Sequence, residues 1–247
     1  ADLSVVTSPQ MKAELLSSGV TDVAVWQKGV DTQRFHPRHY SHSMRHALSG
    51  GHPRDPLLLY VGRLGSEKKL TQLKDTLEKI PHARLAFVGE GPGEEELRRY
   101  FQGMTRAEFI GPLRGEALSQ AFASCDVFCM PSDSETLGFV VLEAMASGVP
   151  VVGADAGGIP NLVSNGTTGY LVGPGDVEEF TSRVKDLLGD RGVRKRMGAA
   201  ARKEAEKWGW ESATWQLRDE LYPQAMELHR VRKSKDTPSS VAIKRCA

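Results

Sequence analysis

From residue 57 onward, short uninterrupted apolar runs alternate with segments whose apolar residues recur at helical spacing. The runs LLLYVG (57–62) and RLAFVG (84–89) are typical of strands buried on both faces. Amphipathic helices are predicted after them, at SEKKLTQLKDTLEKI and PGEEELRRYFQG. The alternation continues with strands predicted at EFIG, DVFCMP, PVVGA and TGYLVG, and helices at EALSQAFASC and FVVLEAMASG. This order predicts an α/β fold with a doubly wound parallel sheet, which binds ligands at the carboxyl ends of its strands.

The segments around this repeating part are interpreted from their composition. Residues 1–30 look like the last βαβ piece of a preceding domain with its crossover, and residues 31–56 look like a linker. The main α/β domain is expected at 57–190, followed by C-terminal helices at 191–229. The basic segment 230–247 has no periodicity and predicts a disordered tail. Attraction of that tail to an anionic membrane is the alternative.

The overall composition excludes several classes of protein. The chain of 247 residues is 40% hydrophobic and 26% charged, which is ordinary for a globular domain. Its 32 basic and 31 acidic residues nearly cancel, which argues against nucleic acid as the main partner. Its three cysteines make no disulfide framework and have no metal-binding spacing. Cys125 and Cys129 adjoin a predicted strand and are expected in the core.

The stretch from Pro131 to Gly148 carries the strongest chemical signal. It places Glu135 and Glu143 eight positions apart, with Leu137-Gly138 opening an apolar helix between them. A helix start offers unpaired N–H groups and a positive dipole end, so it suits a diphosphate. Glu143 would lie roughly 8 Å further along the helix. Phosphates at the helix start with a carboxylate on either side match a sugar–diphosphate–ribose ligand. The alternative is a pair of solvated glutamates.

Two cations follow the first predicted strand. In VGRLGSEKKL, Gly62 ends the strand, and Arg63 and Lys68 lie at its carboxyl end and at the start of the next helix. These cations could neutralise a diphosphate without a metal, although an ordinary solvated loop is an equal alternative. No Asp-x-Asp, carboxylate cluster or His/Cys spacing predicts a metal site, so we expect no metal and no cofactor.

Two glycine-rich loops follow later strands. In VGEGPGEEE, Gly89 and Gly91 are expected in a tight turn that lets a nucleobase or ribose approach the backbone. The spacing does not fit Gly-x-Gly-x-x-Gly. In AGGIPNLVSNGTTG, Gly157 and Gly158 could let the backbone approach a sugar, or could form a simple turn.

Taken in order, KGVD-x4-F-x-P, YVGRL-x3-KK, FVGEGP, DVFCMPSDSETLGFVVLEAMASGVPVV, AGGIP and TGYLV resemble the donor half of retaining glycosyltransferases of family four. The resemblance covers most of residues 24–190. It implies the GT-B fold, in which two Rossmann-like domains face each other and the C-terminal one binds the nucleotide sugar. The resemblance also implies roles for single residues. Arg63 and Lys68 would bind the diphosphate, and Leu137 and Gly138 would bind its phosphates through their backbone. Glu135 would bind the sugar hydroxyls, Glu143 would bind the ribose, and Gly62 and Gly89 would adjoin the nucleotide.

A narrower resemblance links VWQKGVDTQRFHPRHYSHSMRHALS, GRLGSEKKL and PSDSETLGFVVLEAM to the sulfoquinovosyltransferases of plants, algae and cyanobacteria. These enzymes transfer sulfoquinovose from its UDP form to diacylglycerol, which implies a membrane-surface acceptor and a chloroplast location, peripheral to the membrane (or the cytoplasmic membrane face in a cyanobacterium). Lys28, at the interdomain turn, is compatible with a sulfonated sugar or a lipid surface. The acceptor domain is expected upstream of Ala1, which leaves open whether the chain is active alone.

Other function classes stay open at this point. The chain could be a nucleotide-sugar-binding fragment without catalysis or a membrane-associated regulatory piece. It could also serve another UDP-sugar-dependent lipid glycosyltransferase. A nicotinamide-dependent oxidoreductase uses a similar sheet, but the dinucleotide motif with its acidic partner is missing from the sequence.

Overall fold

The computed structural model of the chain describes residues 1–26 and 29–236 and divides the chain into two compact units. One unit runs from Val30 to Trp210, and the other combines Ala1–Gly29 with the segment that begins at Glu211. Lys28 and residues 237–247 lie outside the described residues, so the structure does not test the predictions made for them.

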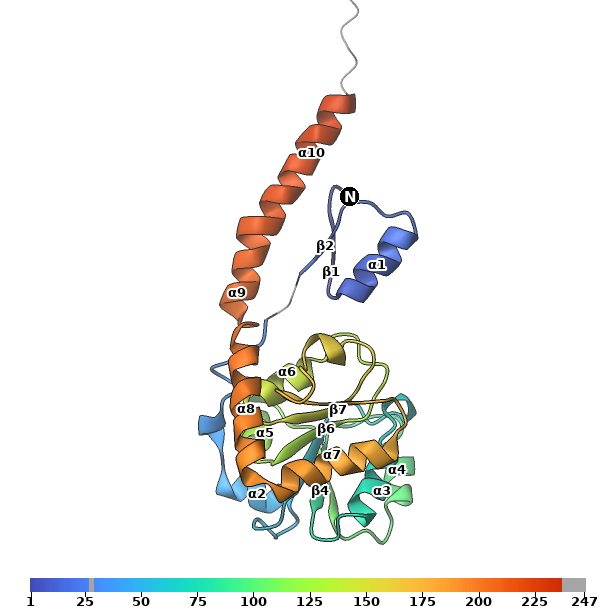
Figure 1. Ribbon diagram of the computed structural model, residues 1–247, viewed down its shortest axis with the longest axis vertical. Coiled ribbons are helices and arrows are strands. Elements are labelled where there is room, and N and C mark those ends of the chain that lie inside the picture. Colours follow the sequence, from blue (N-terminus) through green and yellow to red (C-terminus); the bar gives the residue numbers. More distant parts are fainter. Residues whose placement is uncertain (27–28, 237–247) are drawn as a thin grey trace, which may run out of the picture. The chain divides into compact units, whose positions relative to one another are not determined.

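The larger unit is built on a parallel sheet (Figure 1). Its strands are β3 (Leu57–Val61), β4 (Arg84–Val88), β5 (Ala107–Gly111), β6 (Val127–Met130), β7 (Val151–Ala154) and β8 (Gly169–Val172). They are ordered β5-β4-β3-β6-β7-β8, and every pairing is parallel. The chain therefore runs from β3 at the centre of the sheet to β5 at one edge. It then returns to β6 beside β3 and runs to β8 at the other edge. This topology confirms the predicted doubly wound α/β fold.

Helices cover both faces of this sheet (Figure 1). Helices α3 (Gln72–Glu78), α4 (Glu94–Tyr100) and α7 (Val177–Gly189) lie on one face, and α5 (Gly115–Ala123) and α6 (Phe139–Ala146) lie on the other. Because both faces are covered, Leu57 to Tyr60 of the central strand β3 are fully buried. The uninterrupted apolar runs in the sequence follow directly from this double burial.

The single helix predicted for residues 66–80 is wrong in detail. The chain forms a 3₁₀ turn, η2 (Ser66–Lys68), and α3 begins only at Gln72. Lys69 separates the two with φ of 53°, in the left-handed region that a helix cannot contain. Its Nζ bonds to the Asp133 carboxylate. A contact 64 positions away thus opposes local helix propensity, and the turn brings Lys68 to the end of β3.

The linker predicted for residues 31–56 is also wrong. This segment contains η1 (Pro37–His39) and α2 (His42–Leu48) and belongs to the larger unit. Arg45 on α2 donates to Asp126 Oδ2 at 2.7 Å and to the Asp55 carbonyl at 2.9 Å. Leu48, at the end of α2, is fully buried. These contacts make the segment part of the core, although its sequence has no clear period.

The smaller unit contains the predicted strand–helix–strand piece. Its elements are β1 (Ser4–Val6), α1 (Pro9–Ser17) and β2 (Val23–Val25), and the two strands are parallel. Trp26 Nε1 donates to the carbonyl of Ala213 at 2.8 Å, which joins this piece to the C-terminal segment.

C-terminal helices continue through and beyond the predicted range. They are α8 (Arg191–Glu206), α9 (Trp210–Trp215), the π-helical η4 (Gln216–Leu221) and α10 (Tyr222–Asp236). The larger unit includes α8, so it extends past residue 190. Disorder was predicted from residue 230, but residues 230–236 form the last turns of α10. None of the described helices is both long and apolar enough to cross a membrane.

Arg202 of α8 is predicted to be a main polar contact between this helix and the rest of the larger unit. Its Nη1 donates to the carbonyls of Thr32, Phe35 and Ala146 at 2.9, 2.8 and 2.6 Å. Its side chain is only 13% exposed. Arg202→Ala should lower the free energy of unfolding by about 2–3 kcal/mol, because it leaves buried carbonyls without donors. Urea titration measures the change. The control Arg99→Ala, at a side chain 70% exposed, should cost less than about 0.5 kcal/mol; equal losses would contradict the assignment.

Candidate functional site

A cavity of about 360 Å³ opens at the carboxyl ends of β3 and β6. These two strands are neighbours in the sheet, and the chain leaves them toward opposite sides. Doubly wound sheets bind their ligands at such a switch point, because the loops separate there. The cavity is lined by Val61, Gly62, Arg63, Lys68, Ser134, Glu135, Thr136, Leu137, Gly138, Phe139 and Val140.

Most of the residues singled out from the sequence meet in this cavity. Those that line it are Gly62, Arg63, Lys68, Glu135, Leu137 and Gly138. Gly89 and Glu143 are not among the lining residues. Sequence reasoning did not single out five lining residues, and the only signal for them was their position beside predicted residues: Val61, Ser134, Thr136, Phe139 and Val140.

An ion pair joins the two sides of the cavity. Lys68 Nζ, from the loop after β3, bonds to Glu135 Oε1, from the loop after β6. The Lys68 and Glu135 side chains are only 13% and 18% exposed, so solvent screens the pair less than a surface pair. Beneath it, burial and then the Glu135 charge raise the pKa of Tyr60, which keeps its phenol protonated. The Tyr60 hydroxyl donates to the Arg63 carbonyl at 2.9 Å, which holds the start of the loop.

Arg63 lies at the outer edge of the cavity. Its Nη2 is 2.5 Å from Glu67 Oε1, and its side chain is 63% exposed. An ion pair this exposed contributes little to stability. The guanidinium can therefore exchange Glu67 for an anionic ligand at small cost.

A second bridge runs beside the first. Lys69 bonds to Asp133, and this hydrogen bond holds the pKa of Asp133 below its usual range. The two bridges connect consecutive residues of one loop to alternate residues of the other. Nothing in the local sequence pattern predicted the Lys69–Asp133 pair, because it depends on β3 and β6 being neighbours.

Helix α6 starts at the cavity, as the sequence predicted. Gly138 is its N-cap with φ of 62°, and no side chain caps the helix. The N–H groups of Val141 and Leu142 donate to the Gly138 carbonyl. Within the part of the chain that the structure describes, no acceptor takes the N–H groups of Phe139 and Val140, which both line the cavity. Two free donors at a positive dipole end make this edge suitable for an anion.

The loop that carries Glu135 is fixed by close backbone contacts at Gly157 and Gly158. A Cβ on Gly157 would lie 2.3 Å from the Glu135 carbonyl oxygen, and one on Gly158 would lie 2.4 Å from that of Thr136. The Gly158 N–H also donates to the Glu135 carbonyl at 2.6 Å. These glycines support the loop, and they are not among the residues that line the cavity.

Gly89 has a similar structural position behind the cavity. With φ of 135°, it lies so close to Gly62 that a Cβ would be 2.0 Å from the Gly62 carbonyl oxygen. The Gly62 N–H donates to the Val88 carbonyl at 3.0 Å. Gly89 thus sets the path of the chain at Gly62, and from there the position of Arg63.

Glu143 lies one turn into α6, beyond the residues that line the cavity. Burial raises the pKa of Glu143 to about 7, and the charge of Arg34 opposes this shift. Among residues 1–26 and 29–236, nothing hydrogen-bonds or ion-pairs with its carboxylate. At a pH near 7 this carboxyl group is thus partly protonated, and it can still form hydrogen bonds with a ligand.

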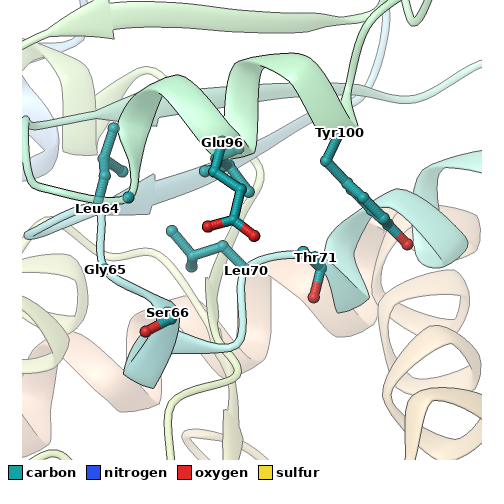
Figure 2. Close-up of a pocket in the computed structure, with 9 residues that line it drawn as sticks. Leu64, Gly65, Ser66, Leu70, Thr71, Glu96 and Tyr100 are labelled. Carbon is teal, nitrogen blue, oxygen red and sulfur yellow. The ribbon is translucent and has the colours of Figure 1, made fainter.

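A smaller hollow of about 170 Å³ lies between the loop after β3 and helix α4 (Figure 2). Leu64, Leu70 and Leu97 supply its apolar lining. Figure 2 shows the Glu96 carboxylate pointing into it from α4, with Tyr100 at one end. Because this hollow offers a carboxylate and no cation, it does not suit a diphosphate. The loop therefore presents Arg63 and Lys68 to the first cavity and apolar side chains to the second.

Comparison with known proteins defines the class to which this site belongs. Residues 48–204, more than half of the chain, match the family model described as glycosyl transferases group 1. The chain belongs to this family of glycosyltransferases.

Two individual glycosyltransferases are similar to this chain over most of its length. The chain is 49% identical over 239 residues to the sulfoquinovosyl transferase SQD2 of Arabidopsis thaliana, a match that covers 94% of this chain and 47% of the relative. It is 34% identical over 204 residues to a GDP-mannose-dependent alpha-mannosyltransferase of Corynebacterium glutamicum, covering 83% of this chain and 48% of the relative. The chain thus spans about half the length of the curated relatives it matches.

Solved structures share the fold. Sucrose-phosphate synthase from Thermosynechococcus elongatus superposes with a TM-score of 0.80 at 29% identity, covering 92% of this chain and 59% of that one. HepE from Anabaena, solved in complex with UDP, gives a TM-score of 0.81 at 25% identity, covering 90% and 64%. These matches confirm the resemblance to GT-B glycosyltransferases.

Burial of Glu143 predicts a pH-dependent stability. Its folded pKa of about 7 lies above the ordinary 4.5, so the folded state holds the proton more tightly. Stability should therefore fall as pH rises from about 4.5 to about 7. Glu143→Gln should be more stable than wild type at pH 8, by on the order of 2–3 kcal/mol, and nearly equal at pH 4.5. Urea titrations at both pH values measure this. In the control Glu95→Gln, at a side chain 93% exposed, the difference in stability from wild type should be the same at both pH values. If Glu143→Gln also differs from wild type by the same amount at both pH values, the raised pKa of Glu143 is contradicted.

The close contact at Gly157 predicts a large cost for a single methyl group. Gly157→Ala should lower the free energy of unfolding by about 2–4 kcal/mol, because it adds a clash to the strain of a positive φ. Gly166→Ala is the matched control, with φ of 76° in the same loop and open space around its Cβ. It should cost only the backbone strain, about 1 kcal/mol. Thermal or urea unfolding compares the two, and equal costs would show that the contact with Glu135 is unimportant.

Proposed function

We propose that the chain is the donor-binding half of a retaining glycosyltransferase that transfers sulfoquinovose from UDP-sulfoquinovose to diacylglycerol, in sulfolipid biosynthesis. The observation that carries the proposal is the 49% identity to the Arabidopsis sulfoquinovosyl transferase over 94% of this chain. The cavity at the switch point supports it, because it combines cations, free helix N–H groups and a carboxylate.

We assign the diphosphate, the sugar and the ribose of the donor to separate groups at and beside the cavity. Lys68, Arg63 and the N–H groups of Phe139 and Val140 bind the diphosphate by charge-assisted hydrogen bonds. Glu135 accepts hydrogen bonds from hydroxyls of the sugar. Glu143, on the next turn of the helix, is the proposed acceptor for the ribose hydroxyls.

The proposed chemistry follows from this placement. The bond between the anomeric carbon and the phosphate oxygen breaks, and a bond to the acceptor hydroxyl oxygen forms on the same face of the sugar. The proton of that hydroxyl passes to the departing phosphate oxygen. Negative charge grows on the leaving diphosphate, where Lys68, Arg63 and the helix start stabilise it. In this proposal, side-chain cations supply the charge stabilisation, without a metal ion or cofactor.

The setting of the reaction is part of the same proposal. The acceptor, diacylglycerol, is a lipid, so the reaction takes place at a membrane surface. We place the acceptor-binding domain upstream of Ala1 and the enzyme on a chloroplast membrane, or on the cytoplasmic membrane face in a cyanobacterium. Without the acceptor domain, the chain serves as a nucleotide-sugar-binding fragment.

A different nucleotide sugar is the second candidate. Relatives that are GDP-mannose-dependent share 34–37% of their residues with this chain, so the shared diphosphate machinery does not select the base or the sugar. This candidate differs from the first in the donor only.

Competition among donors tests the proposed function. UDP-sulfoquinovose should displace UDP from the chain at lower concentration than UDP-glucose, and GDP-mannose should compete at least tenfold more weakly. Isothermal calorimetry measures these affinities, and Lys68→Ala should weaken all of them by about tenfold, because it removes a charge-assisted contact.

The outcomes separate the candidates. A preference for GDP-mannose or UDP-glucose would reject the sulfoquinovosyl assignment and keep the glycosyltransferase. Binding that Lys68→Ala leaves unchanged would reject the site itself.

A further inference from the structure

We propose that the Lys68–Glu135 ion pair makes the site select the intact nucleotide sugar over the free nucleoside diphosphate. The inference rests on the proposed function, since it assigns the diphosphate and the sugar to the same cavity. It adds a role in ligand specificity that belongs to the contact between the two residues and not to either residue alone.

The pair is an exclusive one. Each cation of the loop after β3 has its own acid: Arg63 pairs with Glu67, Lys68 with Glu135, and Lys69 with Asp133. Within the described residues, Lys68 Nζ makes no other hydrogen bond or ion pair. The Lys68 pair is also the most buried of the three. The ammonium group has three donors but a single charge, so a diphosphate that binds Lys68 competes with Glu135 for that charge.

Losing Lys68 has an energetic cost for Glu135. The Glu135 side chain is only 18% exposed, so water replaces the lost cation only in part. The nearby Tyr60 hydroxyl already donates to the Arg63 carbonyl, so it does not replace Lys68 as a donor. The bound diphosphate also repels the carboxylate across the same cavity. Free UDP must meet this whole cost.

An intact nucleotide sugar offsets the cost. Its sugar follows the diphosphate into the cavity and offers hydroxyl donors to the carboxylate that has lost Lys68. The diphosphate thus takes the place of Glu135 beside Lys68, and the sugar hydroxyls take the place of Lys68 beside Glu135. Because the reaction consumes the nucleotide sugar and releases the nucleoside diphosphate, the pair favours the substrate and promotes product release.

The proposal predicts opposite effects of one substitution on two ligands. Glu135→Gln frees Lys68 and should tighten binding of UDP about fivefold, a change of about 1 kcal/mol. The same substitution should weaken binding of UDP-sulfoquinovose at least fivefold, because the amide is a poorer acceptor for hydroxyls. Isothermal calorimetry on the 247-residue chain measures both affinities. UDP-glucose serves as a second sugar probe, and Glu135→Ala as a second variant with the same expectation.

Two controls distinguish exchange of the ion pair from a general effect of charge. Asp133→Asn removes one negative charge from the same loop and leaves Lys68 paired, so UDP affinity should change less than twofold. In a Lys68→Ala background, Glu135→Gln should tighten UDP binding clearly less than it does in the presence of Lys68, because no cation is left to release and only the repulsion between carboxylate and diphosphate is relieved.

The results that would overturn the inference are distinct from those that reject the proposed function. If wild type binds UDP and Glu135→Gln binds it equally or more weakly, the inference fails while the donor site stands. If Asp133→Asn tightens UDP binding as much as Glu135→Gln, or the gain is equally large without Lys68, long-range charge explains it and the inference fails. If wild type binds neither UDP nor either UDP-sugar, the proposed function fails with it.

Discussion

Backbone contact between the loops that leave neighbouring strands is the constraint on which the site depends. Gly89 lies against Gly62, and Gly157 lies against Glu135, with no room for a Cβ at either place. Both contacts lie at the carboxyl edge of the sheet, beside β3 and β6. With the loops fixed in this way, Lys68 and Glu135 face each other across the cavity. A side chain at either glycine would move a loop and separate the charges.

The fixed loops concentrate charge in a small volume. Three cations from one loop each meet a carboxylate, and two of these pairs join the loops after β3 and β6. The uncapped start of α6 adds free N–H donors at the same edge. Each of these three cations already has an acidic partner, so an anionic ligand must replace a carboxylate in order to bind one of them. The same geometry therefore explains both how a diphosphate would bind and why its sugar would matter to its affinity.

The sequence predicted those parts of the fold and the site that depend on local pattern. The inner strands of the sheet have nearly continuous apolar runs because both faces are covered, and Glu135 and Gly138 could be found from their positions at the start of an apolar helix. The break at Lys69 could not be found, because lysine suits a helix and only the contact with Asp133 opposes it.

The remaining differences also come from long-range contacts. Residues 31–56 resembled a linker because contacts that hold them in the fold, such as the one from Arg45 to Asp126, join residues far apart in the sequence. The pairing of Lys68 with Glu135 depends on strand order, which no local pattern encodes. Gly89 was expected beside the nucleotide; it does not line the cavity, and a Cβ on it would meet the backbone of Gly62.

The most direct test of the account is a crystal structure of the chain with UDP bound. The account predicts the diphosphate between the loops after β3 and β6, with Lys68 Nζ and the first N–H groups of α6 within hydrogen-bonding distance of its oxygens. It also predicts that Lys68 is then separated from Glu135. A nucleotide bound in the hollow beside Glu96, or at the cavity with the Lys68–Glu135 pair intact, would contradict it.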